Sequence, residues 1–214
     1  EIMAITMLMG GPDINPYVSY DENITFVKGM SGSERRLAFI RGDLNATREN
    51  PAAYKKHVMP LIEKGVAETW FHHGILDVKS GQHIDDPNFS EPTFEKLYFD
   101  MYNIEASEAH GAFYDAYKLV KSWRDSLQKA FWVNKNNPNK QKLIDALNKM
   151  IADPESVAAI EKKVGKYNWR VGEDGNDTVK ILKSFITPEA LNVLVHFSNT
   201  KLGYNTVYKE ELTK

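Results

Sequence analysis

Residues 24 to 45 carry the pattern on which the fold prediction rests. They read Ile24-Thr25-Phe26-Val27-Lys28-Gly29-Met30-Ser31-Gly32-Ser33-Glu34-Arg35-Arg36-Leu37-Ala38-Phe39-Ile40-Arg41-Gly42-Asp43-Leu44-Asn45. Residues 24–28 are rich in β-branched and aromatic side chains and end at a glycine, which is typical of a short buried strand. Small hydroxyl residues then precede Glu34, as at many helix N-termini, and Gly42 marks the end of the helix. The stretch therefore predicts a strand, a turn and a helix.

The same alternation continues along the chain. Further β-rich runs predict strands at residues 66–71 and 130–133, and residues 43–46 are also expected to form a short strand. Apolar residues at helical spacing, together with prolines and acidic residues at helix starts, predict helices at residues 2–9, 51–64, 93–102, 112–123, 143–151, 154–164, 174–185 and from 187 onward. Strands that alternate with helices predict an α/β fold, with helices crowding the C-terminal half.

The beginning of the chain predicts that part of the protein is missing. Glu1 is not an initiator methionine, and no secretory signal pattern follows it. Residues 2–9 read instead as the end of a helix that stops at Gly10-Gly11-Pro12. We therefore expect an N-terminally incomplete chain.

The composition excludes several classes of protein. The 214 residues are 42% hydrophobic and 26% charged, which is ordinary for a globular protein with a core. The formal net charge of −2 removes the main electrostatic reason to expect nucleic-acid binding. No apolar run approaches the roughly 20 residues needed to cross a bilayer, so we expect no membrane-spanning segment. The absence of cysteine excludes disulfides, zinc–thiolate sites and cysteine nucleophiles.

A candidate anion site lies at Ser31, Gly32 and Ser33. A helix that begins directly after a strand presents free backbone N–H groups and a partial positive charge, which suit a carboxylate. The segment is not a P-loop, because the Gly-Lys-Ser/Thr ending is missing, and it lacks the Gly-x-Ser-x-Gly elbow of many hydrolases. The alternative is an ordinary capped helix that binds nothing.

A second candidate is the pair Thr47 and Arg48, which lies between a predicted strand and the next helix. An arginine at this place can grip a carboxylate with two parallel hydrogen bonds. Loops that follow strands in open α/β sheets are also where ligands collect. The alternative is a surface salt bridge from Arg48 to Glu49 or Glu34.

A third candidate is the pair His72 and His73 at the end of a predicted strand. Because strand neighbours face opposite sides, one ring is expected to face a cleft and the other to pack. The loop that follows contains Asp77, His83, Asp85 and Asp86. These residues could add nitrogen and oxygen ligands for a metal, but their spacing matches no known ligand pattern. We predict no metal and no cofactor.

The order of these motifs resembles that of the solute-binding receptors of the tripartite tricarboxylate transporter family. The resemblance begins with the strand, the Gly29 to Glu34 turn and the helix that ends in Arg41-Gly42-Asp43. It continues through Ala130-Phe131-Trp132-Val133 and Asn137-Pro138, and through the helix starts Asp153-Pro154-Glu155 and Thr187-Pro188-Glu189. The individual motifs are short, so their order and spacing carry the resemblance.

The resemblance implies an α/β, periplasmic-binding-protein-like (type II) two-lobed fold, here without the N-terminal part of lobe 1. On this basis residues 1–75 would form mostly lobe 2 and residues 76–92 the hinge. Residues 93–214 would form the C-terminal, helix-rich part of lobe 1. Two lobes of this kind close on a ligand held between them.

The implied function is that of a periplasmic receptor rather than an enzyme. It would capture a small organic carboxylate and deliver it to membrane transporter subunits. Ser31, Gly32, Ser33, Thr47 and Arg48 would bind the carboxylate, with His72 or His73 at the cleft edge. The alternative is a small α/β enzyme that uses His72, His73 and neighbouring aspartates for metal-assisted or general-base chemistry.

Overall fold

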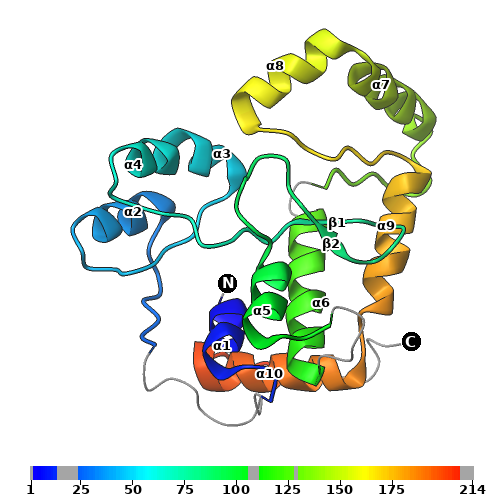
Figure 1. The fold of residues 1–214 in the computed structure, drawn as a ribbon. Helices are drawn as coiled ribbons and strands as arrows, with labels where there is room; N and C mark the ends of the chain where they lie inside the picture. Colours follow the sequence, from blue (N-terminus) through cyan, green and yellow to red (C-terminus); the bar gives the residue numbers. More distant parts are fainter. Residues whose placement is uncertain (1, 14–23, 106–110, 128–129, 208–214) are drawn as a thin grey trace.

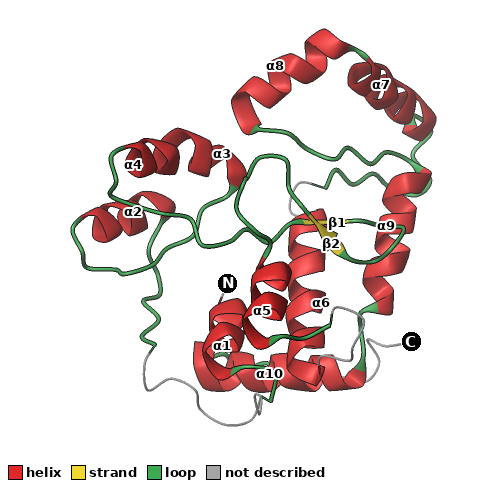
Figure 2. Cartoon of the chain, viewed as in Figure 1, coloured by secondary structure: helices red, strands yellow, loops and turns green. Residues whose placement is uncertain are grey.

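The chain folds mainly into helices. The computed structural model describes residues 2–13, 24–105, 111–127 and 130–207. Of these residues, 57% are helical. Within the same ranges the strands are limited to β1 (Ile75–Leu76) and β2 (His83–Ile84), which pair antiparallel with Ile75 opposite Ile84 and Leu76 opposite His83. Figure 1 and Figure 2 show this short hairpin beside a set of helices.

The predicted two-lobed α/β fold of type II is therefore wrong. Residues 24–28, 43–46, 66–71 and 130–133, expected as strands, form no ladder in the described part of the chain. A β-rich run is stable as a strand only when a neighbour satisfies its backbone groups, and these runs find none there. His72, just beyond the third of them, makes a single parallel bridge to Thr93. The hairpin that does form includes part of the polar segment expected to be a loop.

The predicted helices are confirmed. They are α1 (Ile2–Gly10), α2 (Gly32–Ile40), α5 (Phe94–Tyr102), α6 (Gly111–Leu127), α7 (Lys140–Ala152), α8 (Pro154–Val164), α9 (Glu173–Ser184) and α10 (Pro188–Leu202). Local sequence explains why several begin where they do. The side chains of Thr93, Asp153 and Thr187 each accept a hydrogen bond from a backbone N–H in the first turn.

The helix predicted from Pro51 to Gly65 forms in three parts. These are α3 (Pro51–Ala53), a π-helical turn η1 (Tyr54–Val58) and α4 (Met59–Glu63). Pro60 has no N–H to donate to the carbonyl four residues earlier, so a regular α-helix cannot continue through this point. The N–H of Met59 instead donates to the carbonyl of Tyr54, which widens the turn.

The core lies where α1, α5, α6 and α10 meet. Phe94 is fully buried at its centre, with its ring centroid 4.6 Å from that of Tyr117 and 5.7 Å from that of Tyr98. Phe113 of α6 meets Phe197 of α10 edge to face at 5.7 Å. Met3, Ala4 and Met7 of α1 belong to the same cluster. Figure 1 shows α10 crossing below α1, α5 and α6.

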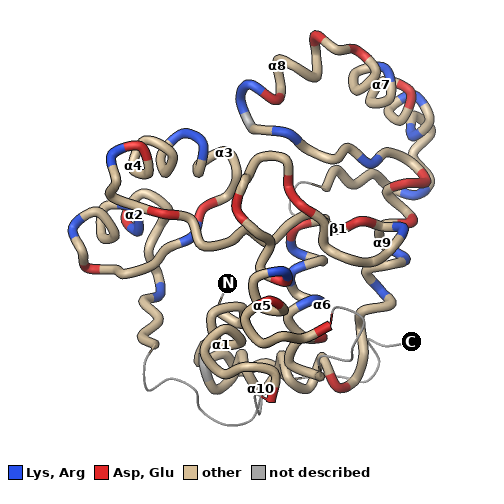
Figure 3. The backbone as a smooth tube through the Cα atoms, viewed as in Figure 1, with Lys and Arg blue, Asp and Glu red and all other residues tan. Residues whose placement is uncertain are grey.

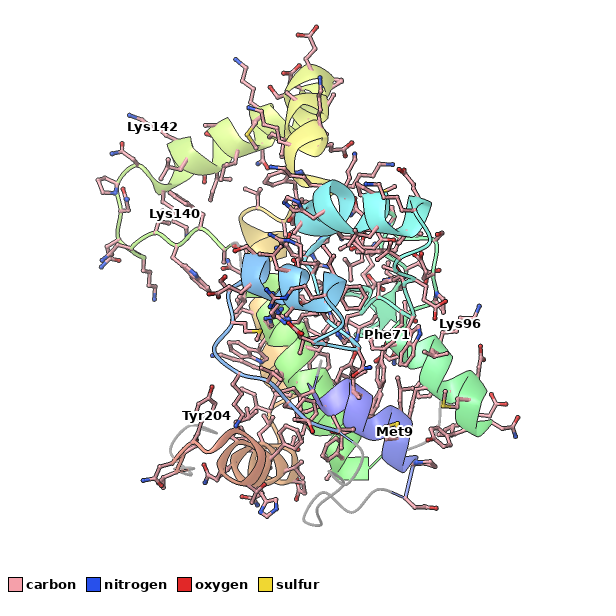
Figure 4. All side chains as sticks on the ribbon, turned by 90° about the vertical axis from the view of Figure 1, so that its left-hand side faces the viewer. Met9, Phe71, Lys96, Lys140, Lys142 and Tyr204 are labelled. Atoms are coloured by element: carbon pink, nitrogen blue, oxygen red, sulfur yellow. The ribbon has the colours of Figure 1, made fainter. Side chains whose placement is uncertain are left out.

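Two helical groups lie outside this core. The first comprises α2, α3 and α4, in which only Ala38 of α2 is fully buried. The second is the α7–α8 hairpin, in which α7 buries no side chain. Lys140 and Lys142 project outward from this hairpin in Figure 4. The domain boundaries predicted at residues 75 and 92 stay a prediction.

Within the described ranges, no helix combines the length and the apolar character that crossing a membrane requires.

Replacing Phe94 by alanine should lower the free energy of unfolding by about 3–5 kcal/mol, because a fully buried aromatic ring is lost and a cavity remains. Urea unfolding followed by circular dichroism measures the change. Phe131→Ala is the matched control, since that ring is 77% exposed and should contribute less than about 0.5 kcal/mol. Equal losses in the two variants would contradict the placement of Phe94 at the centre of the core.

Candidate functional site

A buried polar cluster joins the β-hairpin to α5 and α6. Its members pack against the α6 helix; they are the half-buried His73 and the buried His83, Glu95, Tyr114, Tyr117, Lys121 and Ser122. Four of them come from α6 at spacings of three, four and one residues. Such spacings place side chains on one face of a helix. The cluster therefore forms because one face of α6 carries polar groups into an otherwise apolar contact.

Glu95 lies at the centre of this cluster. Its Oε1 accepts a hydrogen bond from the Tyr114 hydroxyl at 2.5 Å and lies 3.2 Å from His83 Nδ1. Burial raises the pKa of Glu95, but the hydrogen bond and charge of His83 and the Tyr114 hydroxyl outweigh burial and leave that pKa below its usual value. Burial and the adjacent Glu95 raise the pKa of Tyr114. Glu95 is therefore a buried carboxylate with two partners.

Ser122, His83 and Glu95 are connected in the same order as the catalytic triad of a serine hydrolase. Ser122 Oγ lies 3.2 Å from His83 Nε2, and the opposite ring nitrogen faces Glu95. A nucleophile must however reach its substrate, and Ser122 is 0% exposed in the middle of α6. Ser122 lines neither the recess beside α2 nor the cavity formed by residues 85–92 and Lys96. These hydrogen bonds therefore hold the hairpin against the helices, and each contributes about 0.5–1.5 kcal/mol to the free energy of unfolding.

His73 packs inside the same cluster rather than facing an opening. Its Nδ1 lies 2.8 Å from the Tyr117 hydroxyl, and its ring contacts Phe71 edge to face. Burial and the nearby charge of Lys121 lower the pKa of His73 to about 2, so the ring is neutral at neutral pH. Lys121 itself is buried, donates to the Gly74 carbonyl at 3.4 Å and forms an ion pair with Asp125.

His72 faces the other side of the chain, as the alternation of side chains predicts. Its ring is stacked on Phe89, with centroids 5.1 Å apart and planes 10° from parallel. Its Nδ1 accepts the backbone N–H of Gly74 at 2.9 Å, and Asp85 is the carboxylate beside its Nε2, at 4.0 Å. The two histidines therefore enter different environments and do not form one site.

Ser31, Gly32 and Ser33 form the predicted helix N-terminus, at α2. Ser31 Oγ accepts the N–H of Glu34, and the Glu34 carboxylate accepts the N–H of Ser31 at 2.7 Å, which is a capping box. The backbone bond from Ser31 lowers the pKa of Glu34. An external carboxylate would have to displace Glu34 to reach the Ser31 amide.

A recess of about 360 Å³ lies beside this capping box. The residues that line it come from α2, from its C-terminal cap and from the segment that precedes the helix. They are Lys28, Gly29, Met30, Glu34, Leu37, Ala38 and Arg41. Lys28 and Arg41 bring two cationic groups to its wall, while Leu37 and Ala38 provide an apolar side. The sequence predicted the turn next to this recess but neither of the two cations.

Thr47 and Arg48 lie apart from this recess. Both are exposed in the segment between α2 and α3, and neither lines this recess or the cavity formed by residues 85–92 and Lys96. The carboxylate of Glu49, a possible partner of Arg48 in the sequence, accepts a bond from Arg36 at 2.7 Å. The structure therefore does not bring Arg48 together with Ser31, His72 or His73 around one cavity.

The loop aspartates have local structural roles. Asp77 accepts hydrogen bonds from the backbone of Lys79 and Ser80, and Asp86 accepts two from Asn88. These contacts are those of residues that cap turns. Over the ranges that the structure describes, no three histidine, aspartate or glutamate side chains are grouped so that they could hold a metal ion.

Five members of the buried cluster were not predicted as site residues from the sequence, namely Glu95, Tyr114, Tyr117, Lys121 and Ser122. A signal for four of them was present, because residues 114, 117, 121 and 122 share one face of a helix that also carries apolar side chains. Polar residues on a core-facing helix surface require buried partners. The identity of those partners depends on the hairpin, which no local pattern indicated.

Comparisons with protein-family models, with curated proteins and with solved structures found no match for this chain.

The free energy of unfolding should fall as the pH drops below about 6.5 because of His73. The unfolded chain binds a proton at the ordinary pKa of 6.5, whereas the folded chain does so only at about 2. Between these values the unfolded state holds one more proton, which gives a slope of about 1.4 kcal/mol per pH unit. His73→Asn keeps an acceptor for Tyr117 and should reduce the slope by about 1.4 kcal/mol per pH unit, measured by urea unfolding between pH 7 and pH 5. A smaller slope should remain, because burial also lowers the pKa of His72. An unchanged slope would mean that a group other than His73 takes up the additional proton on unfolding.

Ser122→Ala should lower the free energy of unfolding by about 1–3 kcal/mol, because His83 Nε2 is left buried without a partner. A fluorophosphonate probe should not label the folded wild-type chain, since Ser122 is inaccessible. Labelling that disappears in the variant would show instead that Ser122 acts as a nucleophile. Ser126→Ala, one turn further along α6, serves as the control.

Proposed function

We propose that this chain is a non-enzymatic binding protein for a small organic carboxylate, which it holds in the recess beside α2. The observation that carries the proposal is that Lys28 and Arg41 both line this recess. Two cationic groups on one concave wall, next to an apolar side formed by Leu37 and Ala38, suit an anion with a short carbon skeleton.

The hydrogen bonds of Arg41 leave part of its guanidinium available. Nε donates to Asp43 at 2.9 Å and Nη2 lies 2.7 Å from the same carboxylate oxygen. A guanidinium has five N–H donors in a rigid plane, so the Nη1 edge can serve a second carboxylate. The Glu34 carboxylate also faces the recess, but its bond to the Ser31 N–H holds it in the capping box. The wall of the recess therefore retains positive charge on the side where Arg41 lies.

The buried cluster supports binding rather than catalysis. Ser122 is enclosed by helices, and the pKa of His73 is too low for a general base near neutral pH. The enzyme alternative drawn from the sequence retains only His72 with Asp85, separated by 4.0 Å. A binding protein needs no such pair.

The physiological role that we propose follows the resemblance to receptors of tripartite tricarboxylate transporters. In this role the chain acts in the periplasm and passes its carboxylate to membrane transporter subunits. Closure of two α/β lobes is not part of the proposal, because the fold is mostly helical. Binding in a recess on one helical group requires only local rearrangement.

Isothermal titration calorimetry at low salt, with citrate and succinate as probes, tests the proposal. The double variant Lys28→Ala/Arg41→Ala should weaken binding at least about tenfold, because charge-assisted bonds contribute about 1.5–3 kcal/mol. Lys142→Ala, which removes a lysine that projects from α7 in Figure 4, is the charge control and should change nothing. The probes should be recovered chemically unchanged.

An additional variant separates the recess from the residues predicted by sequence. Arg48→Ala should leave the affinity for both probes within about twofold if the recess is the site. A large loss in Arg48→Ala with no loss in the double variant would move the carboxylate to the Thr47–Arg48 segment. Absence of binding by either probe, or their conversion, would overturn the proposal.

A further inference from the structure

Four segments of the chain share one sequence pattern, in which an aspartate stands two residues before an Asn-x-Ser/Thr tripeptide. Asn-x-Ser/Thr, with any residue except proline at x, is the acceptor sequence for N-linked glycosylation. The sequence contains no other such tripeptide, so the aspartate accompanies each of them. The four segments are residues 21–25, 43–47, 86–90 and 174–178, with Asn23, Asn45, Asn88 and Asn176 as the asparagines. Asn23 lies outside the described residues, and the structure distinguishes among the other three.

Asn45 lies in the segment between α2 and α3. Residues 44–50 belong to no helix or strand, and residues 45–48 are all exposed. Neither Asn45 nor Thr47 makes a hydrogen bond to another described residue. The side-chain nitrogen that would accept a glycan and the hydroxyl of the third residue of the tripeptide are therefore both accessible to an enzyme.

Asn88, in the acidic loop after β2 (residues 85–91), is held by three hydrogen bonds. Its Nδ2 donates to Asp86 Oδ1 at 2.7 Å and to the Lys166 carbonyl at 3.0 Å, and its Oδ1 accepts the Lys166 N–H at 2.9 Å. Both N–H groups of the amide nitrogen are thus in use. An enzyme could reach this nitrogen only after the loop has separated from the segment between α8 and α9.

Asn176 is exposed, but its tripeptide is part of α9. The third residue of this tripeptide, Thr178, is buried, and its hydroxyl donates to the Asp174 carbonyl at 2.8 Å and accepts a bond from Arg170 at 3.0 Å. In a helix, side chains two residues apart also do not face each other. Among the three described asparagines, Asn45 alone therefore presents both of the groups that the acceptor sequence requires.

We propose that Asn45 is an acceptor for an N-linked glycan, and that Asp43 belongs to the sequence that the glycan transferase recognises. Figure 3 shows acidic residues, in red, in the loop that follows α2. The Asp43 side chain is 54% exposed and pairs with Arg41 at 2.7 Å. An exposed ion pair contributes little to folding, so a cationic group of the transferase can take the place of Arg41.

The reaction transfers a sugar chain to the side-chain nitrogen of Asn45. The donor is an oligosaccharide joined through a pyrophosphate to a polyprenyl lipid. A bond forms between the amide nitrogen and the anomeric carbon, and the bond from that carbon to the pyrophosphate oxygen breaks. The lipid pyrophosphate leaves with the electron pair of the broken bond, and the amide nitrogen gives one proton to a base of the transferase.

A glycan at this position is compatible with the rest of the molecule, because a bulky polar group requires an exposed loop. Asn45 and Thr47 do not line the recess beside α2, so the inference does not depend on carboxylate binding. It shares with the proposed function only the export of the chain, since glycan transfer of this kind takes place on exported proteins. A reaction of purified components tests it without that step.

The test incubates the folded full chain with a purified oligosaccharyltransferase that requires an acidic residue at this position, and with its lipid-linked donor. Trypsin places the three described asparagines in separate peptides, residues 42–48, 80–96 and 171–180, and mass spectrometry measures the glycan on each. Residues 42–48 should carry at least about tenfold more glycan than either of the others, because those two react only after local opening. A synthetic peptide of residues 42–48 calibrates the activity of the transferase.

Four variants of the full chain test the residues around Asn45. Thr47→Ala should abolish the glycan on residues 42–48, and the conservative Thr47→Ser should retain it. Asp43→Asn should lower its yield at least about tenfold, because a charge-assisted contact with the transferase is lost. Asp145→Asn, which removes the same charge from α7, should leave the yield unchanged.

Three outcomes would contradict the proposal. A folded chain without glycan on residues 42–48, while the synthetic peptide is modified, would overturn the assignment of Asn45. Equal glycan on the three peptides would overturn the selection of Asn45 by the fold. Full yield in Asp43→Asn would remove the aspartate from the recognised sequence. None of these outcomes bears on the carboxylate recess, because the reaction contains neither of its two probes.

Discussion

The Glu95 carboxylate is the group on which the packing of the hairpin, α5 and α6 depends. It is buried beside an aromatic core, where an unpaired charge costs several kcal/mol. His83 and Tyr114 must therefore remain beside it, and they come from β2 and α6. Because the three elements satisfy one carboxylate, the short hairpin keeps a fixed position although it has only two residues in each strand. Ser122 extends this network through His83, and His73 forms a separate contact with Tyr117 on the same helix.

Helices were predictable from this sequence because their signals are local. A cap residue such as Asp153, a proline at the first position and apolar residues every three or four positions all lie within one segment. Strands depend instead on a partner that is distant in the sequence. Residues 66–71 have the composition of a strand, yet Trp70 is exposed and no ladder forms there. Composition alone could not separate this segment from a true strand.

The candidate sites were predictable to a smaller extent. The turn at Ser31 was correctly placed at a helix N-terminus, but its own Glu34 accepts one of the N–H groups that a ligand would use. His72 and His73 face opposite sides, but the ring expected to face a cleft is not found: His72 stacks on Phe89, His73 pairs with Tyr117, and neither lines a cavity among the described residues. The partners that decide their chemistry, Tyr117 for one and Asp85 for the other, follow from the way α6 and the β2–α5 loop pack. Such contacts are tertiary, and no spacing in the sequence encodes them.

The bridge between His72 and Thr93 has a consequence for how this molecule can vary. It joins the chain before the hairpin to the residue that caps α5, through bonds from His72 N–H to the Pro92 carbonyl and from Phe94 N–H to the His72 carbonyl. The acidic loop thus leaves from and returns to fixed anchor points. The entropy of closing a loop between such points grows only slowly with its length. Residues 85–91 can therefore be lengthened, shortened or exchanged with little effect on the aromatic core, which makes this loop a natural place to engineer a new specificity.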